Sequence, residues 1–156
     1  MQVIDKIDKH IIEQLIVDGR MTFANIAKDI NLTDVAIKKR LDRLKQKGII
    51  KNIYAEIDYK VIGFTEDLIV LINAEPTKTN NVIKKLNDID NIIKLYGVTG
   101  EYNLVAQLIA EDKENLQELL NSINTIDGIL KITILTVLKE YKNSKNVPNK
   151  IIQTTF

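Results

Sequence analysis

A short pattern occurs twice in the C-terminal half of this chain and limits the folds that are open to it. LNDIDNIIK at residues 86–94 aligns with INTIDGILK at residues 123–131, an offset of 37 residues. Each copy reads as the end of a helix, a turn and the start of a strand, and a further strand and helix precede each copy. The repeat therefore predicts two β-α-β units in the βαββαβ order of a ferredoxin-like domain.

The elements of this domain follow from alternation in the strands and from the helical spacing of apolar residues. We predict strands over 67–74, 91–98, 103–110 and 129–138, and helices over 79–87 and 113–124. Each helix has one apolar face, so the two helices can cover only one face of the sheet. In the last strand, however, one side is formed by Ile132, Ile134 and Leu138 and the other by Leu135 and Val137. Because soluble proteins rarely expose a large apolar face, we expect a dimer through the uncovered side of the sheet.

Three helices are predicted in the N-terminal third of the chain. The first spans residues 4–17 and begins near Asp5, at an acidic residue that can cap a helix. Thr22 and Thr33 are placed to cap two further helices, because a threonine oxygen accepts from a free first-turn amide. Gly48 ends the third helix, since glycine readily adopts the left-handed conformation that follows a helix. The tight turn between the second and third helices predicts a helix-turn-helix unit.

The third helix, Thr33 to Lys47, is strongly basic on the side away from its apolar stripe. It carries six basic and two acidic side chains, whereas Ile37, Leu41 and Leu44 form the stripe. A helix with a buried stripe, a short partner helix and a cationic outer face fits the major groove of DNA. The alternative is a lysine-rich helix that is simply exposed to solvent. We favour the DNA interpretation because the turn, the caps, the stripe and the charge coincide.

The charge is unevenly distributed along the sequence, although the net charge is only +1. Residues 1–60 carry 12 basic and 9 acidic side chains, residues 61–138 carry 6 and 11, and residues 139–156 carry 4 and 1. A basic N-terminal part followed by an acidic middle part is typical of a DNA-binding module joined to a module with another role.

The residue types that usually mark an enzyme give no support for one here. The chain has no cysteine, and its one histidine, His10, is interpreted as structural because a lone histidine cannot form a zinc site. No glycine-rich phosphate loop occurs, and the acidic pairs at 66–67 and 111–112 lie at element starts, where helix dipoles and caps explain them. We therefore predict no catalytic residue, no metal and no cofactor. No apolar run reaches the roughly 18 residues of a membrane helix and no secretory signal opens the chain, so a soluble, cytoplasmic protein is expected.

Two segments outside the helices and the repeat have their own predictions. Residues 49–57 alternate between apolar and polar positions, which predicts a hinge strand that pairs with the same strand, or with the tail, of a second subunit. Residues 60–65, with Gly63, form a linker. The tail over 139–156 ends in a short apolar run; it is either an arm packed on a neighbouring subunit or a frayed end.

The ordered set of motifs resembles the Lrp/AsnC, or feast/famine, family of bacterial and archaeal transcription regulators. The residues that carry the resemblance are DKHIIEQLIVDGR at 8–20, IAKDINLT at 26–33, RLDRL at 40–44, GII at 48–50 and VTGEY at 98–102. They extend over nearly the whole chain. The resemblance implies an α+β fold: a winged-type helix-turn-helix, a hinge strand and a C-terminal ferredoxin-like domain. It also implies homodimers that assemble into tetramers or octamers, and an amino-acid effector bound between dimers.

The resemblance further implies two sets of site residues. For DNA, the recognition helix presents Thr33, Val35, Lys38 and Lys39 to bases or backbone, and its basic family positions are Arg40 and Arg43. For the effector, the loop over 98–103 supplies Thr99, Gly100, Tyr102 and Asn103, opposed by Thr133, Leu135 and Thr136. The family usually has aspartate where this chain has Asn103, so a charge-assisted bond to an effector ammonium is lost, at a cost of about 1–2 kcal/mol. From the residues alone, Gly100 reads as a tight turn that requires positive φ.

These inferences give one predicted organisation. It consists of a helix-turn-helix DNA-binding domain over 1–48, the hinge strand and linker over 49–65, the effector-binding and oligomerisation domain over 66–138, and the tail over 139–156. The predicted function is sequence-specific regulation of transcription through double-stranded DNA, modulated by an amino acid. The alternative is an architectural protein that compacts DNA and has no small-molecule effector.

Overall fold

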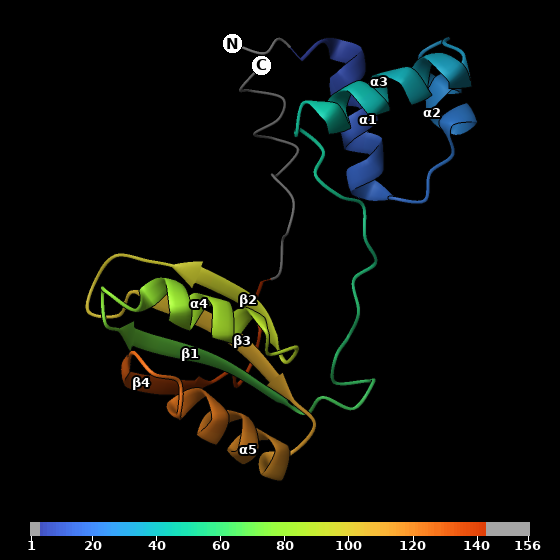
Figure 1. Ribbon diagram of the computed structural model, residues 1–156. Coiled ribbons are helices and arrows are strands. Elements are labelled where there is room, and N and C mark those ends of the chain that lie inside the picture. The colour runs from blue at the N-terminus through green and yellow to red at the C-terminus, as the bar shows by residue number, and fades with distance from the viewer. Residues whose placement is uncertain (1–3, 143–156) are drawn as a thin grey trace. The chain divides into compact units, whose positions relative to one another are not determined.

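The computed structural model describes residues 4–142 (Figure 1). The chain divides into two compact units: the first contains helices α1 to α3 and extends to Glu56, and the second is Ile57–Tyr141. Most of the predicted C-terminal tail, residues 143–156, lies outside the described residues. Between residues 4 and 142, no helix has both the length and the apolar character needed to cross a membrane.

Helices α1 (Lys6–Val17), α2 (Phe23–Asp29) and α3 (Asp34–Gln46) form the N-terminal unit. Their starting points confirm the predicted caps. Asp5 caps α1 through a capping box with Asp8, and the oxygens of Thr22 and Thr33 accept from the third backbone amide of α2 and of α3. Each helix therefore begins where a short polar side chain can satisfy a free first-turn amide.

The turn before α3 and the end of α3 use left-handed backbone. Asn31 in the turn has φ 52°, and Gly48 after α3 has φ 68°. The Gly48 amide donates to the Lys45 carbonyl at 2.9 Å and the Ile49 amide donates to the Leu44 carbonyl at 3.0 Å. This pair of bonds is the Schellman arrangement, which satisfies the last carbonyls of a helix and confirms that Gly48 terminates α3.

The core of the N-terminal unit is small and comes from all three helices. Its buried members are Ile11, Ile26, Ala27, Ile37, Leu41 and Leu44. His10 of α1 has its Nε2 3.7 Å from the Asp29 carboxylate of α2. Three short helices bury little apolar surface, so the core of this unit is small.

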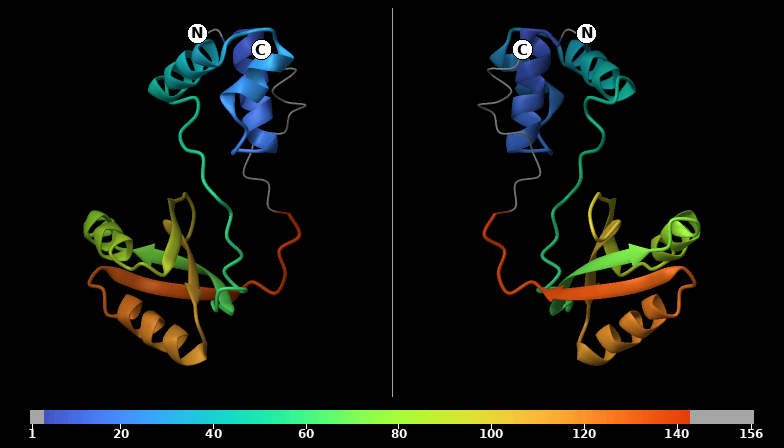
Figure 2. Two further views of the ribbon diagram at one scale, coloured as in Figure 1. Left: turned by 90° about the vertical axis from the view of Figure 1, so that its right-hand side faces the viewer. Right: turned by 90° about the vertical axis from the view of Figure 1, so that its left-hand side faces the viewer.

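The C-terminal unit has the βαββαβ order that the repeat predicts. Its elements are β1 (Glu66–Ala74), α4 (Thr79–Asn87), β2 (Ile92–Gly97), β3 (Leu104–Ala110), α5 (Lys113–Asn124) and β4 (Ile129–Thr136). The strands form one antiparallel sheet in the order β2-β3-β1-β4, so β1 and β3 are central, and Figure 2 shows β1 and β4 side by side. This is the ferredoxin-like topology.

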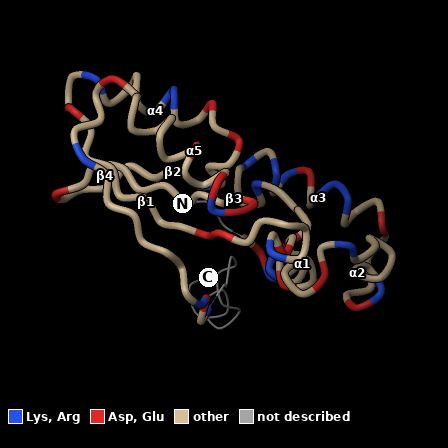
Figure 3. The backbone as a smooth tube through the Cα atoms, turned by 90° about the horizontal axis from the view of Figure 1, so that it is seen from below, with Lys and Arg blue, Asp and Glu red and all other residues tan. Residues whose placement is uncertain are grey.

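Both helices of this unit lie on the same face of the sheet (Figures 1 and 3). The residues of β1 that face them are fully buried, whereas the intervening residues are only partly buried. Val82 and Leu86 of α4 and Ile123 of α5 complete the core. The alternation of burial along β1 is the period of a strand with one covered face.

The other face of the sheet keeps apolar side chains in contact with solvent. Tyr96 of β2 is 53% exposed and Leu135 of β4 is 49% exposed. Ile69 and Leu71 of β1 pair with Leu135 and Thr133 of β4, so they alternate with the buried positions and point to the same open face. The expectation of an apolar face without a covering layer in a single chain is confirmed.

The predicted hinge strand is not formed in this single chain. Within residues 4–142, every strand belongs to the sheet of the C-terminal unit, and residues 51–58 lie in no helix or strand. A strand is defined by a ladder to a neighbouring backbone, and an isolated segment has none. The described residues of the N-terminal unit also contain no wing strand, so its helix-turn-helix is built from helices alone.

Candidate nucleic-acid interface and effector site

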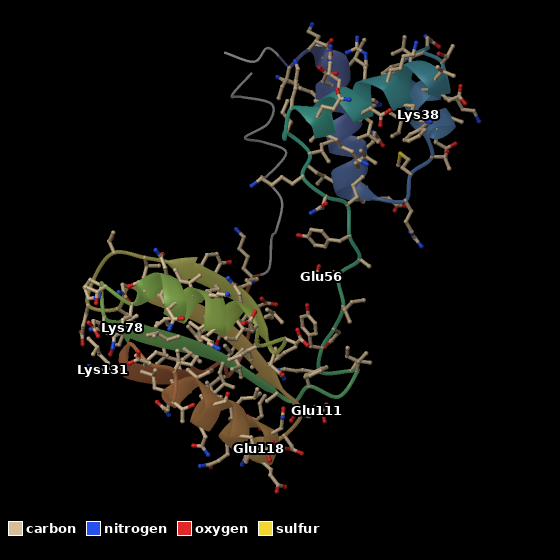
Figure 4. The ribbon with its side chains drawn as sticks, viewed as in Figure 1. Lys38, Glu56, Lys78, Glu111, Glu118 and Lys131 are labelled. Carbon is tan, nitrogen blue, oxygen red and sulfur yellow. The ribbon has the colours of Figure 1, made fainter. Side chains whose placement is uncertain are left out.

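The outer face of α3 combines exposed polar, apolar and basic side chains. Thr33, Lys38 and Lys39 are exposed, and Val35 is 57% exposed even though it is apolar. Figure 3 marks the lysines and arginines along α3, and Figure 4 shows the side chain of Lys38. The opposite stripe, Ile37, Leu41 and Leu44, is buried. Packing therefore fixes which side of the helix can meet a ligand.

The two arginines of α3 are arranged differently from its lysines. Arg40 donates from Nη1 to Asp5 at 2.6 Å and to Asp8 at 2.9 Å, and only 26% of its side chain is exposed. Arg43 donates from Nη2 to the other oxygen of Asp8 at 2.6 Å. Both arginines therefore face acidic residues of α1. Direct contact between these two arginines and DNA stays a prediction.

The acidic partners of these arginines, Asp5 and Asp8, are held in place by the capping box at the start of α1. The Asp5 carboxylate accepts from the Asp8 amide at 2.8 Å, and the Asp8 carboxylate accepts from the Asp5 amide at 3.4 Å. Burial works against ionisation of Asp5, but the hydrogen bond from Arg40 and the nearby amides outweigh it and lower the pKa of Asp5. The Asp5 hydrogen bond in turn raises the pKa of Arg40. Asp5 and Arg40 are therefore both charged at neutral pH.

The predicted effector loop lies between β2 and β3. Thr99 and Gly100 are exposed, and Gly100 has φ +140°. The Tyr102 hydroxyl is 2.7 Å from the Thr133 hydroxyl, so the structure brings together two of the predicted effector residues from different elements. The hydrogen bond with Thr133, followed by that with Lys131, lowers the pKa of Tyr102.

An ion pair that the sequence did not indicate lies beside this tyrosine. Lys131 of β4, which is labelled in Figure 4, donates to the Glu101 carboxylate at 2.8 Å, and its Nζ lies 5.2 Å from the centre of the Tyr102 ring. The hydrogen bonds with Glu101 and then with Tyr102 raise the pKa of Lys131 to about 12. A lysine that is charged at neutral pH therefore lies next to the predicted effector loop.

Asn103 has both ends of its amide engaged by the backbone of Ala74. Its Oδ1 accepts from the Ala74 amide at 2.8 Å and its Nδ2 donates to the Ala74 carbonyl at 2.7 Å. The β1–β3 ladder ends at the pair Ile72 and Leu104, and Leu104 is the first residue of β3. The Asn103 side chain therefore extends the pairing with β1 beyond the start of β3. Asn103 thus has a structural function at the position where the resemblance implies an effector ligand.

The three predicted residues of β4 do not share one side of the sheet. Thr133 pairs with Leu71, Leu135 with Ile69 and Thr136 with Leu68. Leu68 is buried against the helices, whereas Ile69 and Leu71 are not. Because side chains alternate along a strand, Thr136 points to the opposite face from Thr133 and Leu135, and the three residues cannot form one wall together.

Sequence reasoning did not identify Asp8 or Lys131 as members of these two sites. Asp8 carried a usable signal, since an acidic residue three positions after a capping aspartate is typical of a capping box. Lys131 carried no such signal, because its contact with Glu101 joins residues 30 positions apart.

Two family descriptions match different parts of the chain. Residues 4–45 match the AsnC-type helix-turn-helix domain, and residues 67–147 match the Lrp/AsnC ligand binding domain. The first match covers helices α1 to α3, and the second covers the sheet of the C-terminal unit, each to within one residue.

Curated relatives and solved structures agree with these matches. The chain is 33% identical over 118 residues to the transcriptional regulator Ptr1 of Methanocaldococcus jannaschii, covering 76% of this chain and 80% of that protein. It is 33% identical over 120 residues to the regulator LrpA of Pyrococcus horikoshii, covering 77% of this chain and 85% of that protein.

The fold agrees over an even larger part of the chain. The structure of AsnC from E. coli superposes with a TM-score of 0.85 at 26% identity, covering 93% of this chain and 99% of that one. A feast or famine regulatory protein of M. tuberculosis, solved in complex with L-methionine, has the same fold at a TM-score of 0.84 and 23% identity, with the same coverage. Matches to both domains, together with relatives of this identity and coverage, show that the chain belongs to the Lrp/AsnC family of helix-turn-helix transcriptional regulators, which are not enzymes.

Proposed function

We propose that this regulator binds a specific double-stranded DNA sequence by placing α3 in the major groove. One observation carries the proposal: the buried stripe of α3 leaves Thr33, Val35, Lys38 and Lys39 exposed on the opposite side. Lysine side chains can neutralise phosphates, whereas threonine and valine can contact base edges and thymine methyl groups. Both ends of α3 are fixed by caps, which holds this face in one conformation.

We infer that two subunits associate through the open face of the sheet. The apolar residues Ile69, Leu71 and Leu135 on that face support this inference, because burying them removes apolar surface from water. A two-fold dimer presents two copies of α3 to a DNA site with two half-sites about 34 Å apart. Association of such dimers into tetramers or octamers, and the pairing of residues 49–57 between subunits, belong to the same proposal.

We also propose that an amino acid regulates the protein from the loop at 98–103. The match of residues 67–147 to a ligand binding domain supports a small-molecule site in this unit, and the M. tuberculosis relative has been solved with L-methionine. Tyr102 and Thr133 are the predicted residues that lie together, and Thr99 and Gly100 are exposed residues whose backbone amides can donate to a carboxylate. Asn103 supports the loop through Ala74, so we assign it no direct contact with the effector.

The DNA proposal is tested by titrating the full chain into a labelled duplex from its own upstream region. Lys38→Gln/Lys39→Gln should weaken binding, and the dependence of log K on log [salt] should become shallower by about 0.9 for each phosphate that the variant no longer neutralises. Lys84→Gln/Lys85→Gln is the matched control, because these exposed neighbours on α4 change the charge equally in the other unit. Equal weakening in both variants, or no binding by the native chain at low salt, would contradict the proposal.

Competition with random DNA separates the regulator from an architectural protein. A sequence-specific regulator keeps its complex in the presence of excess unrelated duplex, whereas an architectural protein loses it in proportion to the competitor added.

Thermal unfolding with each amino acid at millimolar concentration tests the effector. A ligand that binds the folded state raises the melting temperature, so the absence of any shift would exclude an amino-acid effector and leave the DNA proposal standing.

A further inference from the structure

A buried acidic residue connects α1 to α3 in the N-terminal unit. Among the described residues 4–142, Asp8 is the one charged residue that is buried, with 1% of its surface exposed. One of its oxygens accepts from Arg40 at 2.9 Å and the other accepts from Arg43 at 2.6 Å. A buried carboxylate is stable only when such partners satisfy it, so these bonds are a requirement of the fold.

These hydrogen bonds are directional, so they can fix the orientation of α3 in a way that apolar packing cannot. Arg40 and Arg43 lie three positions apart and therefore on neighbouring turns of one face of α3. Apolar contacts such as those of Ile37 and Leu41 are non-directional, whereas hydrogen bonds require a narrow range of distance and angle. A single carboxylate held by two guanidinium groups therefore fixes the rotation of α3 about its own axis with respect to α1.

The same contacts change the charge that α3 offers to DNA. Asp5 and Asp8 supply two negative charges beside the two arginines, at 2.6 and 2.9 Å from Arg40 and 2.6 Å from Arg43. The lysines of α3 face outward and are exposed. The positive charge of the helix that has no acidic partner of α1 beside it is thus that of the lysines, whereas Arg40 and Arg43 are paired with Asp5 and Asp8, although 44% of the Arg43 side chain is exposed.

We propose that Asp8 is a positioning residue for DNA binding: by holding Arg40 and Arg43 it fixes α3 in the orientation that presents its exposed face to the groove. This inference rests on the proposed function of α3. It predicts an effect opposite in sign to simple electrostatics, because removing a negative charge near a polyanion should strengthen binding. If Asp8 positions α3, removing its charge weakens binding instead.

The experiment compares Asp8→Asn with Asp42→Asn in the full chain, titrated into the upstream duplex. Both variants lose one negative charge from the same unit, and Asp42 is exposed on α3. We expect Asp42→Asn to bind as tightly as the native chain or more tightly. We expect Asp8→Asn to bind about tenfold more weakly or worse, which corresponds to the removal of roughly one base-specific hydrogen-bonded pair. Asp8→Glu, which keeps the charge, should recover part of the affinity.

The dependence of binding on salt distinguishes positioning from direct contact. If Arg43 acts through Asp8, Arg43→Gln weakens binding but leaves the slope of log K against log [salt] unchanged. If Arg43 contacts a phosphate, the slope falls by about 0.9, and the inference is wrong. This measurement also decides the matter if Asp8→Asn does not fold, since Arg40 still pairs with Asp8 in the Arg43 variant.

The outcomes separate the positioning role of Asp8 from the DNA proposal itself. Binding by the native chain together with equal or tighter binding by folded Asp8→Asn overturns the positioning role and leaves the DNA proposal intact. Absence of binding by the native chain overturns both. Stoichiometric titration gives the active fraction of each variant, so that affinities refer to folded molecules only.

Discussion

Replacing Asn103 by aspartate should destabilise the C-terminal unit in a manner that depends on pH. Aspartate has nearly the same shape as asparagine and can still accept from the Ala74 amide, which lies 2.8 Å from Oδ1. It cannot donate to the Ala74 carbonyl, which now accepts from Nδ2 at 2.7 Å, and a second acceptor oxygen would be placed there instead. The family pattern usually has aspartate here, so this variant tests whether the stability of the C-terminal unit depends on the Nδ2 donor of Asn103.

The size of the effect follows from the burial of the partner. Ala74 is 1% exposed, so its carbonyl loses a hydrogen bond without gaining full access to water. An unsatisfied buried acceptor costs about 1–3 kcal/mol, and we expect Asn103→Asp to lower the free energy of unfolding by about 2 kcal/mol at pH 7. For a domain of this size, this corresponds to a melting temperature roughly 10 °C lower.

The sign of the pH dependence distinguishes this mechanism from general disruption. A protonated carboxyl can donate to the Ala74 carbonyl, so folding raises the pKa of the new aspartate above its unfolded value of about 3.9. The stability deficit should therefore be smallest below about pH 4 and should grow as the pH rises through the folded pKa.

Circular dichroism melts of the native chain and the variant between pH 4 and pH 8 measure this difference. Asn80→Asp, an exposed position in the first turn of α4, is the matched control and should change stability by less than about 0.5 kcal/mol. If Asn103→Asp melts with the control at every pH, the amide of Asn103 has no structural function. If its deficit is large but independent of pH, the destabilisation has a cause other than the missing donor.

Three further predictions use single substitutions and stability or size measurements. Gly128→Ala should lower the melting temperature, because Gly128 has φ +100° and the added Cβ would lie 2.6 Å from the Cβ of Lys78. Gly63→Ala is the control for the backbone cost alone, because Gly63 has φ +111° and open space around it. Equal melting temperatures for the two variants would contradict the clash. Leu135→Lys places a charge on the open face of the sheet and should convert a dimer into monomers by light scattering, whereas an unchanged mass would show that this face is not the interface. Asp5 has a lowered pKa in the folded state, so the stability it provides is present above its unfolded pKa and is lost as the pH falls below about 4; Asp5→Asn should flatten this acid limb of the unfolding profile.

The elements of this fold could be predicted because their signals are local. The helices α4 and α5 have the predicted bounds, Thr79–Asn87 and Lys113–Asn124, and α3 lies between the cap at Thr33 and the stop at Gly48. Capping residues, left-handed glycines and apolar periodicity all act within a few positions of the chain. The repeat then gave the order of strands and helices, and the order restricted the topology of the sheet.

The site could be predicted only in part, because its contacts join residues that are far apart in the sequence. Asn103 meets Ala74 across 29 positions, and Arg40 meets Asp8 across 32. No local pattern states whether an amide at a strand start faces a ligand or an unpaired segment of backbone. For the hinge strand, the local signal was clear but the partner was missing. Residues 49–57 alternate between apolar and polar positions, but a strand needs a neighbouring backbone, and the described residues of one chain supply none for this segment.

The charge of α3 shows why counting basic residues is an incomplete argument for DNA binding. Sequence alone treats the arginines and the lysines of this helix as one cationic surface. In the fold, Arg40 is 26% exposed and held by two carboxylates, and Arg43 is 44% exposed and held by one, whereas Lys38 and Lys39 are exposed and have no acidic partner on α1. Arginine is well suited to bridging the two helices, since its planar group can bind several oxygens and is only weakly hydrated, while lysine is a strongly hydrated point charge that suits the phosphate backbone. We therefore expect the arginines to hold the helix and the lysines to be the groups whose counterion release a salt titration detects.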